Sequence, residues 1–336
     1  MGLRYTEADC PATWKIFRPG KSFPEDTSSI ASLQQASRWL QDCLENHRQC
    51  GSRSKHELPY RVIDVGRPDS ETSVRLYESH GEFDHYVSLS HCWGKFQMIK
   101  TERASLSLRK RGITWSSLPP TFQDAITFVR NLGLRYIWID SLCIIQDDKA
   151  DWEIESAKMA QIYMNSLLTL AVTKSASAEE GCFVVTPAED RTFAITGSTK
   201  DGTPYTIYAR RPVYHLGGAF ARHKDLFPLF YRAWCYQERL LAPRILQFNP
   251  RELMWECCEV SACECSLSCP TFPDKQRHSK ALTQGSDPKS FNDRWRHMVV
   301  DYAKLDLTYE SDRLPALSGA AKQMQPHRSG KYLAGL

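Results

Sequence analysis

The chain has 336 residues, of which 42% are hydrophobic and 24% charged, a composition typical of a globular protein with a sizeable core. Its 43 basic and 39 acidic residues give a net charge of +4, too small an imbalance to indicate nucleic-acid binding. The sequence contains no run of about 18 apolar residues and no apolar segment behind Met1. We therefore expect neither a membrane span nor a secretory signal.

The first part of the chain combines an irregular segment, a helix and a hairpin. Residues 1–30 are rich in Pro, Gly and Ser. Residues 32–50 repeat apolar side chains at helical spacing and predict an amphipathic helix. Two short alternating segments, 60–66 and 73–79, are separated by a turn-rich stretch and predict a pair of strands. Residues 1–80 are therefore interpreted as an N-terminal extension.

The clearest pattern follows, with three apolar strands separated by two helices. The strands are predicted at 85–93, 135–145 and 167–173, and the helices at 118–133 and 151–166. A β-α-β-α-β order predicts a parallel sheet with right-handed crossovers. The fold class is therefore α/β, with a flavodoxin-like parallel core and helices on both faces.

Local signals define the ends of the two helices. Thr121 with Asp124 resembles a capping box, and Gly133 stands at the expected C-terminal stop of the first helix. Asp151 is the expected N-terminal cap of the second helix.

The rest of the chain predicts a long insertion, a return to the core and a helical end. Residues 180–229 resemble turns and short strands. A helix at 234–242 and a strand at 244–248 follow, with a further strand near 252–258. A Cys-rich and Pro-rich loop then leads to two C-terminal helices. We accordingly divide the rest of the chain into a core and a C-terminal part.

The core is placed at 81–260, with its insertion at 180–229, and the Cys-rich loop and C-terminal helices at 261–336.

Ligands of parallel sheets bind outside the carboxyl ends of the strands. In this chain the segments after the first two strands contain eight candidate site residues. They are Ser90, His91, Trp93, Gly94, Lys95, Asp140, Ser141 and Gln146. His91 can act as acid or base, Lys95 can meet a phosphate, and Gly94 permits close backbone approach. The other interpretation is structural, with Trp93 anchoring a turn and the acidic residues after Gln146 leading into the next helix.

Glu238 shares one stripe of its predicted helix with Trp234 and Leu241, so a carboxylate lies between two large apolar side chains. A partly buried carboxylate with a shifted pKa is a common mark of an active site. The alternative is a structural ion pair, because buried charges are normally paired. Three arginines offer that pairing: Arg232, Arg239 and Arg244.

Twelve cysteines are a high count, and two groups are dense. Cys43, His47 and Cys50 stand at i, i+4 and i+7 on one helix face, which can bind Zn²⁺ if a fourth ligand arrives from elsewhere. The second group lies between Cys257 and Cys269. Neither has the spacing of a paired C-x-x-C zinc motif, and reduced thiols are the other interpretation.

Several separate blocks resemble the fungal heterokaryon incompatibility (HET) domain. They are "YVSLSHCWGK", "LPPTFQDAITFVRNLGLRYIWIDSLCIIQDDKADWEIESAKMAQIYMNS", "FYRAWCYQERLLAPRILQF", "WEC" and "DRLPALSGAA". The blocks occur in the family's order and extend over residues 36–320. The resemblance implies a cytoplasmic fungal protein of nonself recognition and programmed cell death.

A second resemblance is to Toll/interleukin-receptor (TIR) domains, in which a W-C-x-x-E segment begins a helix after the third strand. Trp234, Cys235 and Glu238 match that segment. The resemblance implies a TIR-like core and a catalytic role for Glu238 in cleaving NAD. That reaction passes through an oxocarbenium-like state, whose positive charge a nearby carboxylate stabilises.

Two functions follow from these resemblances. In the first, the chain is a toxic effector domain that hydrolyses NAD, with Glu238 as the catalytic residue. The strand-end loops and Trp234 then hold the dinucleotide. In the second, the chain is a non-enzymatic death-signalling module. Either function implies self-association or binding to other incompatibility proteins.

Overall fold

The computed structural model describes most of the chain. The described residues are 2–5 and 18–19 (backbone only), 24–51, 53–66, 73–94, 98–210, 224–265, 273–283 and 288–327.

The core is an eight-stranded mixed sheet with the order β14-β13-β12-β9-β7-β8-β4-β5. Its four central strands are parallel: β7 (Tyr86–Ser90), β8 (Tyr136–Trp138), β9 (Leu168–Ala171) and β12 (Arg244–Phe248). Antiparallel strands continue the sheet on both sides: β4 (Arg61–Asp64), β5 (Arg75–Glu78), β13 (Leu253–Cys257) and β14 (Ser261–Cys263). The α/β class is confirmed. The sheet as a whole is mixed, because the hairpin at 60–79 joins it beside β8.

The order in which the parallel strands are added to the sheet reverses at β7. The chain passes from β7 to β8 on one side and then returns to β9 on the other side of β7. Such a switch point opens a crevice at the carboxyl ends of the flanking strands, because the following loops diverge there. The site-bearing end of the sheet therefore lies after Ser90 of β7 and Ala171 of β9.

Two crossover helices flank the three first parallel strands: α3 (Pro120–Asn131) and α5 (Lys149–Asn165). Right-handed crossovers that run in opposite directions along a sheet place their helices on opposite faces. Gly133 ends α3 as predicted, with φ of +71°. The predicted capping residues were wrong. The N-cap of α3 is Pro119, and Asp124 instead accepts a hydrogen bond from the Cys182 backbone.

The N-cap of α5 is Asp148, one turn before the predicted Asp151. The Asp148 carboxylate accepts hydrogen bonds from the backbone N–H groups of Ala150 and Asp151. Asp151 is instead paired with the buried Arg61 of β4, at 2.5 Å. Asp151 therefore neutralises the buried guanidinium of Arg61 and does not cap the helix.

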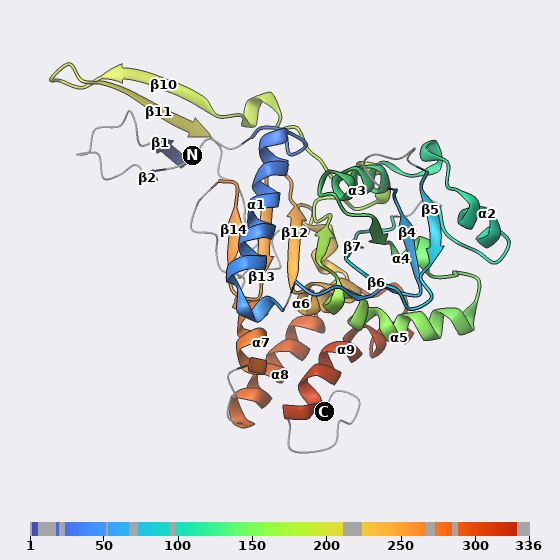
Figure 1. Ribbon diagram of the computed structural model, residues 1–336. Helices are drawn as coiled ribbons and strands as arrows, with labels where there is room; N and C mark the ends of the chain where they lie inside the picture. The colour runs from blue at the N-terminus through green and yellow to red at the C-terminus, as the bar shows by residue number, and fades with distance from the viewer. Residues whose placement is uncertain are drawn as a thin grey trace.

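The third crossover helix is α6 (Ala233–Leu241), and it leads into β12. It packs against α5, against α7 (Pro273–Thr283) and most extensively against α9 (Pro315–Met324). Helix α8 (Pro288–Tyr302) joins the same apolar cluster, and Figure 1 shows these C-terminal helices grouped at one end of the sheet. Helix α7 lies in the stretch where the sequence predicted only a loop.

Helix α1 (Ile30–Asn46) packs against β13, in front of the sheet in Figure 1, and Ala36, Leu40 and Cys43 are buried along it as its spacing predicts. Short elements complete the described structure. They are α2 (Leu106–Arg111), α4 (Asp140–Cys143), β3 (His56–Glu57) and β6 (Phe83–Asp84).

The predicted insertion contains one long hairpin, β10 (Phe193–Ser198) and β11 (Pro204–Arg210), which projects from the body of the molecule (Figure 1). Its strand β11 also pairs with β1 (Gly2–Tyr5), which pairs with β2 (Arg18–Pro19). Within the described ranges, no helix has both the length and the apolar content needed to cross a bilayer.

Candidate functional site

Glu238 and Ser90 meet at the carboxyl end of the central strand. Ser90 is the last residue of β7, and Glu238 lies in the middle of α6. The Ser90 hydroxyl donates a hydrogen bond to Glu238 Oε2 at 2.5 Å. Both side chains are buried, with Glu238 only 5% exposed. The sheet and its third crossover helix thus hold a carboxylate inside the molecule, at the edge where ligands of such sheets bind.

The environment of Glu238 shifts its ionisation into the neutral range. Burial is the largest cause and raises the pKa of Glu238 to about 7. The hydrogen bond from Ser90 opposes this shift, since it favours the ionised form, and Asp140 adds to it through charge repulsion. Arg232 and Tyr163 also favour ionisation. Near neutral pH both protonation states of Glu238 are therefore populated, as general acid-base catalysis requires.

The three neighbouring arginines do not form a direct ion pair with Glu238. Arg239 is paired with Glu256 of β13, at 2.8 Å. Arg244 donates to the backbone carbonyls of Leu167 and Gly51. Arg232 lies at the N-cap of α6 and acts on Glu238 through its charge. Two of the three predicted structural pairings are therefore directed elsewhere, and the third is electrostatic.

Asp140 brings the end of β8 to the same cluster. Its Oδ2 accepts a hydrogen bond from the Trp93 indole at 2.9 Å, and its Oδ1 lies 3.9 Å from His91 Nδ1. Oδ1 also accepts from the Ser141 backbone N–H, at the start of α4. The loops after β7 and β8 are thus joined through one half-buried carboxylate.

His91 and Ser141 contribute polar atoms that are buried but lack protein partners. In the described part of the chain, neither ring nitrogen of His91 nor the Ser141 hydroxyl has a hydrogen-bond partner. Burial lowers the pKa of His91 to about 4, against a weaker opposite effect of Asp140, so its imidazole is neutral at physiological pH. Unpaired buried polar atoms are uncommon and need an explanation. A ligand that supplies donors and acceptors is one such explanation.

Gly94 lies in the left-handed region, with φ of +82°. A Cβ at this position would lie 2.5 Å from Cβ of Ser177, which follows β9. The glycine therefore permits a close approach between the loops on the two sides of the switch point. Lys95, the predicted phosphate contact, lies outside the described residues.

Two other predicted residues point away from Glu238. Gln146 donates to the backbone carbonyls of Asp140 and Ile144, so it stabilises the loop after α4. Trp234 donates from its indole to Asp312 Oδ2 at 3.0 Å. The tryptophan therefore joins α6 to the C-terminal helices.

Three residues near the carboxylate were not predicted from sequence as site residues. Cys235 Sγ lies 3.7 Å from the Ser90 hydroxyl, and Tyr163 donates to the Leu89 carbonyl and interacts with Glu238. Arg232 acts electrostatically on Glu238, His91 and Cys92. The position of Arg232 just before the W-C-x-x-E segment was a signal in the sequence, but it indicated only an ion pair with Glu238.

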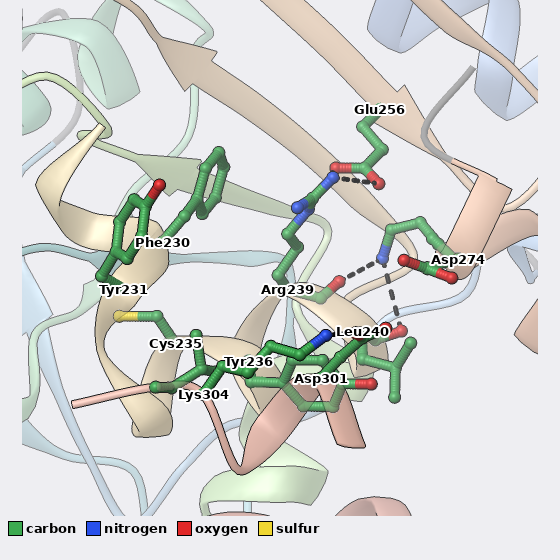
Figure 2. A pocket seen from close by; sticks show the side chains of 12 residues that line it. Phe230, Tyr231, Cys235, Tyr236, Arg239, Leu240, Glu256, Asp274, Asp301 and Lys304 are labelled. Atoms are coloured by element: carbon green, nitrogen blue, oxygen red, sulfur yellow. Dashed lines mark hydrogen bonds and ion pairs between the residues drawn. The ribbon is translucent and has the colours of Figure 1, made fainter. Parts of the chain in front are cut away.

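A cavity of about 220 Å³ lies on another side of α6, and Figure 2 shows the side chains that line it. Arg239 bends toward Glu256 in its wall, and Asp301 and Lys304 line its far side. Cys235 belongs both to this cavity and to the neighbourhood of Ser90. Glu238 lines neither this cavity nor the two others described in the molecule.

The cavity wall also contains Lys275 of α7. Its buried ammonium donates to the carbonyls of Arg239 and Ala242 at the C-terminal end of α6. A cation at the carbonyl end of a helix is favoured by the helix dipole. Lys275 thus stabilises the end of the helix that carries Glu238.

The predicted metal ligands Cys43, His47 and Cys50 also converge, and Cys257 of β13 lies with them. This group is built from α1 and the outer part of the sheet. It is separate in sequence and composition from the cluster around Glu238.

Comparison with known proteins finds a family match within the core. Residues 86–238 match the family model described as "Heterokaryon incompatibility protein (HET)". Searches of curated proteins and of solved structures gave no match. The matched range begins at the first residue of β7 and ends at Glu238, so it contains both partners of the buried hydrogen bond. Residues 86–238 of this chain therefore contain a region similar to the heterokaryon incompatibility (HET) family.

Proposed function

We propose that this chain is an effector domain of fungal nonself recognition that causes cell death by hydrolysing NAD. The observation that carries the proposal is the buried Glu238 carboxylate, bonded to Ser90 at the carboxyl end of β7. The family match supports the role in heterokaryon incompatibility. The chemistry rests on the placement and ionisation of Glu238.

The strand order supports a flavodoxin-like and TIR-like interpretation of the core. In chain order, the parallel strands are arranged as second, first, third and fourth. Flavodoxin-like sheets begin with that arrangement and bind ligands beside their first strand. Glu238 comes from the helix between the third and fourth parallel strands, as the W-C-x-x-E resemblance requires.

In the proposed reaction, water replaces nicotinamide at C1′ of the ribose. The products are nicotinamide, ADP-ribose and a proton. Ionised Glu238 accepts hydrogen bonds from ribose hydroxyls and stabilises the positive charge that develops as the bond to nicotinamide breaks. The neutral His91 and the Ser141 hydroxyl supply unpaired polar atoms for the dinucleotide.

The burial of Glu238 adds a condition to this mechanism. A carboxylate that is 5% exposed and lines none of the three cavities contacts a dinucleotide only after neighbouring side chains move. The proposal therefore couples activity to self-association or to binding of another incompatibility protein. Such a partner supplies the free energy for the opening.

The same observation favours the second candidate function, a non-enzymatic death-signalling module. In that case Glu238 is a buried structural group satisfied by Ser90 and by the charge of Arg232. The loops at the sheet edge then act as an assembly surface.

One experiment separates the two functions. The purified chain is incubated with NAD over a range of protein concentrations, and released nicotinamide is measured by chromatography. Glu238→Gln is expected to lower the rate roughly 100-fold or more. Glu155→Gln is the matched control, since Glu155 is also a buried helical carboxylate but is paired with Lys158.

Growth arrest on expression of the same variants is measured in parallel. Nicotinamide release that requires Glu238 supports the enzyme. The absence of release at every concentration, with growth arrest retained in Glu238→Gln, would establish the signalling module instead.

A further inference from the structure

Four side chains from α1, from the turn after it and from β13 meet beside the outer strands of the sheet. They are Cys43, His47, Cys50 and Cys257. Cys257 Sγ lies 3.3 Å from His47 Nδ1, although the two residues are 210 positions apart in sequence. The three cysteines are almost completely buried.

The spacing of the ligand atoms suits a tetrahedral metal ion. The three sulfur atoms and one imidazole nitrogen all lie within 4.8 Å of one another. Ligands at zinc–sulfur bond lengths in a tetrahedron are about 3.8 Å apart. Three thiolates and one imidazole form one of the standard ligand sets of structural zinc.

The backbone presents these ligands from defined positions. Cys43 lies in the last turn of α1, His47 is its C-cap, and Cys50 ends the following short 3-10 helix. Gly51 next to it has φ of +80°, a conformation that turns the chain away.

Cys257 is the last residue of β13, and its sulfur accepts a hydrogen bond from the Val260 backbone N–H at 3.4 Å. The two halves of the cluster are also joined directly. The Gln49 backbone N–H donates to Glu259 Oε1 at 2.6 Å.

The surroundings supply the polar partners that a metal-bound His and thiolates require. His47 Nε2, the nitrogen away from Cys257, lies 3.8 Å from Asp42 Oδ2. A carboxylate beside the distal nitrogen orients a ligating imidazole. Arg244 stands opposite Cys257 in the β12–β13 pairing. Its positive charge offsets the net negative charge of Zn²⁺ with three thiolates.

We propose that Cys43, His47, Cys50 and Cys257 bind one structural Zn²⁺ ion. With four protein ligands the site is closed, so it has no coordination position for a substrate. The ion fastens the C-terminal end of α1 to the outer strand β13. This proposal is independent of the proposed NAD chemistry.

The first test measures bound metal in the intact chain. The protein is purified after expression with zinc, gel-filtered to remove loose metal, and analysed by elemental mass spectrometry. We expect about one zinc per chain. Cys257→Ala and His47→Ala each remove one ligand, and we expect them to lower the zinc content after gel filtration well below one ion per chain. Cys143→Ala, at a buried cysteine outside the cluster, and Cys258→Ala, at the adjacent thiol, are expected to retain the ion.

Cobalt substitution tests the ligand set in the wild-type chain, so this test does not depend on whether a variant folds. The wild-type chain loaded with Co²⁺ should show the strong visible bands of tetrahedral cobalt and thiolate-to-cobalt charge transfer. His47→Cys should retain the tetrahedral bands and increase the charge-transfer intensity, because a fourth thiolate replaces the imidazole. The proposal is overturned by a wild-type chain without bound zinc, by an octahedral cobalt spectrum, or by full zinc content in Cys257→Ala. A disulfide between cluster cysteines in the purified protein would also overturn it.

Discussion

The hydroxyl of Ser90 on β7 and the carboxylate of Glu238 on α6, 148 residues apart in the sequence, are joined by a hydrogen bond of 2.5 Å. The bond links the central strand to the third crossover helix inside the molecule. Burial raises the pKa of Glu238, and the hydrogen bond from Ser90 acts in the opposite direction.

The pKa of Glu238 predicts a pH-dependent effect of Glu238→Gln on stability. The pKa rises from 4.5 to about 7 on folding, so the native state holds the proton more tightly than the unfolded state. The stability linked to this proton is complete below pH 4.5 and is lost as pH rises through about 7. Glutamine cannot ionise and avoids this loss. Urea unfolding at pH 4.5 and 8 should therefore show the variant gaining on the order of 3 kcal/mol relative to wild type between the two conditions. An equal difference at both pH values would contradict the assignment.

Ser90→Ala should raise the pKa of Glu238 further, because the hydroxyl stabilises the ionised carboxylate. Carbon-detected NMR of labelled glutamate side chains measures this directly. Ser88→Ala is the matched control, since Ser88 lies on the same strand and bonds to Thr169 instead. A lower pKa in Ser90→Ala would show that the bond stabilises the neutral acid.

If Glu238 cleaves NAD in its ionised form, the rate should rise with pH through about 7. The pH profile of nicotinamide release by the assembled wild-type chain checks this. A rate that falls over the same range would identify the protonated acid as the active form.

Gly94→Ala should destabilise the chain by more than its backbone conformation alone explains. The left-handed conformation costs an alanine about 1–2 kcal/mol, and the clash with Ser177 adds about 1–3 kcal/mol. Gly202→Ala is the matched control, because Gly202 has φ of +84° but no atom within 4 Å of a Cβ. Similar losses in the two variants, measured by urea unfolding, would mean that the loops at the switch point separate easily.

Arg239→Met should cost about 3–5 kcal/mol in unfolding free energy, because it leaves the fully buried Glu256 without its cation. Arg313→Ala removes an exposed pair with Glu310 and should change stability by less than about 1 kcal/mol. Equal effects would show that Glu256 is neutralised by other means.

The positions of the central strands and their helices could be predicted because their side chains are buried on regular stripes. The strand predicted at 135–145 was too long, because β8 covers only Tyr136–Trp138 and α4 begins at Asp140. The strand ranges around β7, β8 and β9 are nearly continuous apolar runs, and the helices between them repeat at helical spacing.

Capping was predicted wrongly where a long-range contact used the same side chain. Asp124 and Asp151 have partners that local sequence does not contain: the Cys182 backbone and Arg61.

Helix α7 was missed because its sequence is polar and follows a Cys-rich and Pro-rich stretch, while its buried residues contact α6 and α8. The strands β4 and β5 were predicted as a hairpin, but their place beside β8 depends on pairing that local patterns do not encode.

Two residues of the candidate site could be recognised in the sequence because they break an apolar pattern. Glu238 interrupted an apolar stripe, and Asp140 followed an apolar strand, so both were recognisable as unusual. Two other contacts depend on how distant segments pack. They are the hydrogen bond from Trp234 to Asp312 and the approach of Cys257 to His47. Spacing within one segment cannot reveal such partners.

Because Ser90 and Glu238 are far apart along the chain, the ribosome synthesises Ser90 well before Glu238. The strands β7, β8 and β9 are all synthesised before the hairpin of β10 and β11, and α6 follows only after that hairpin. A chain interrupted between β9 and α6 therefore contains three of the four parallel strands without the carboxylate. Premature termination in this interval yields a fragment that lacks Glu238.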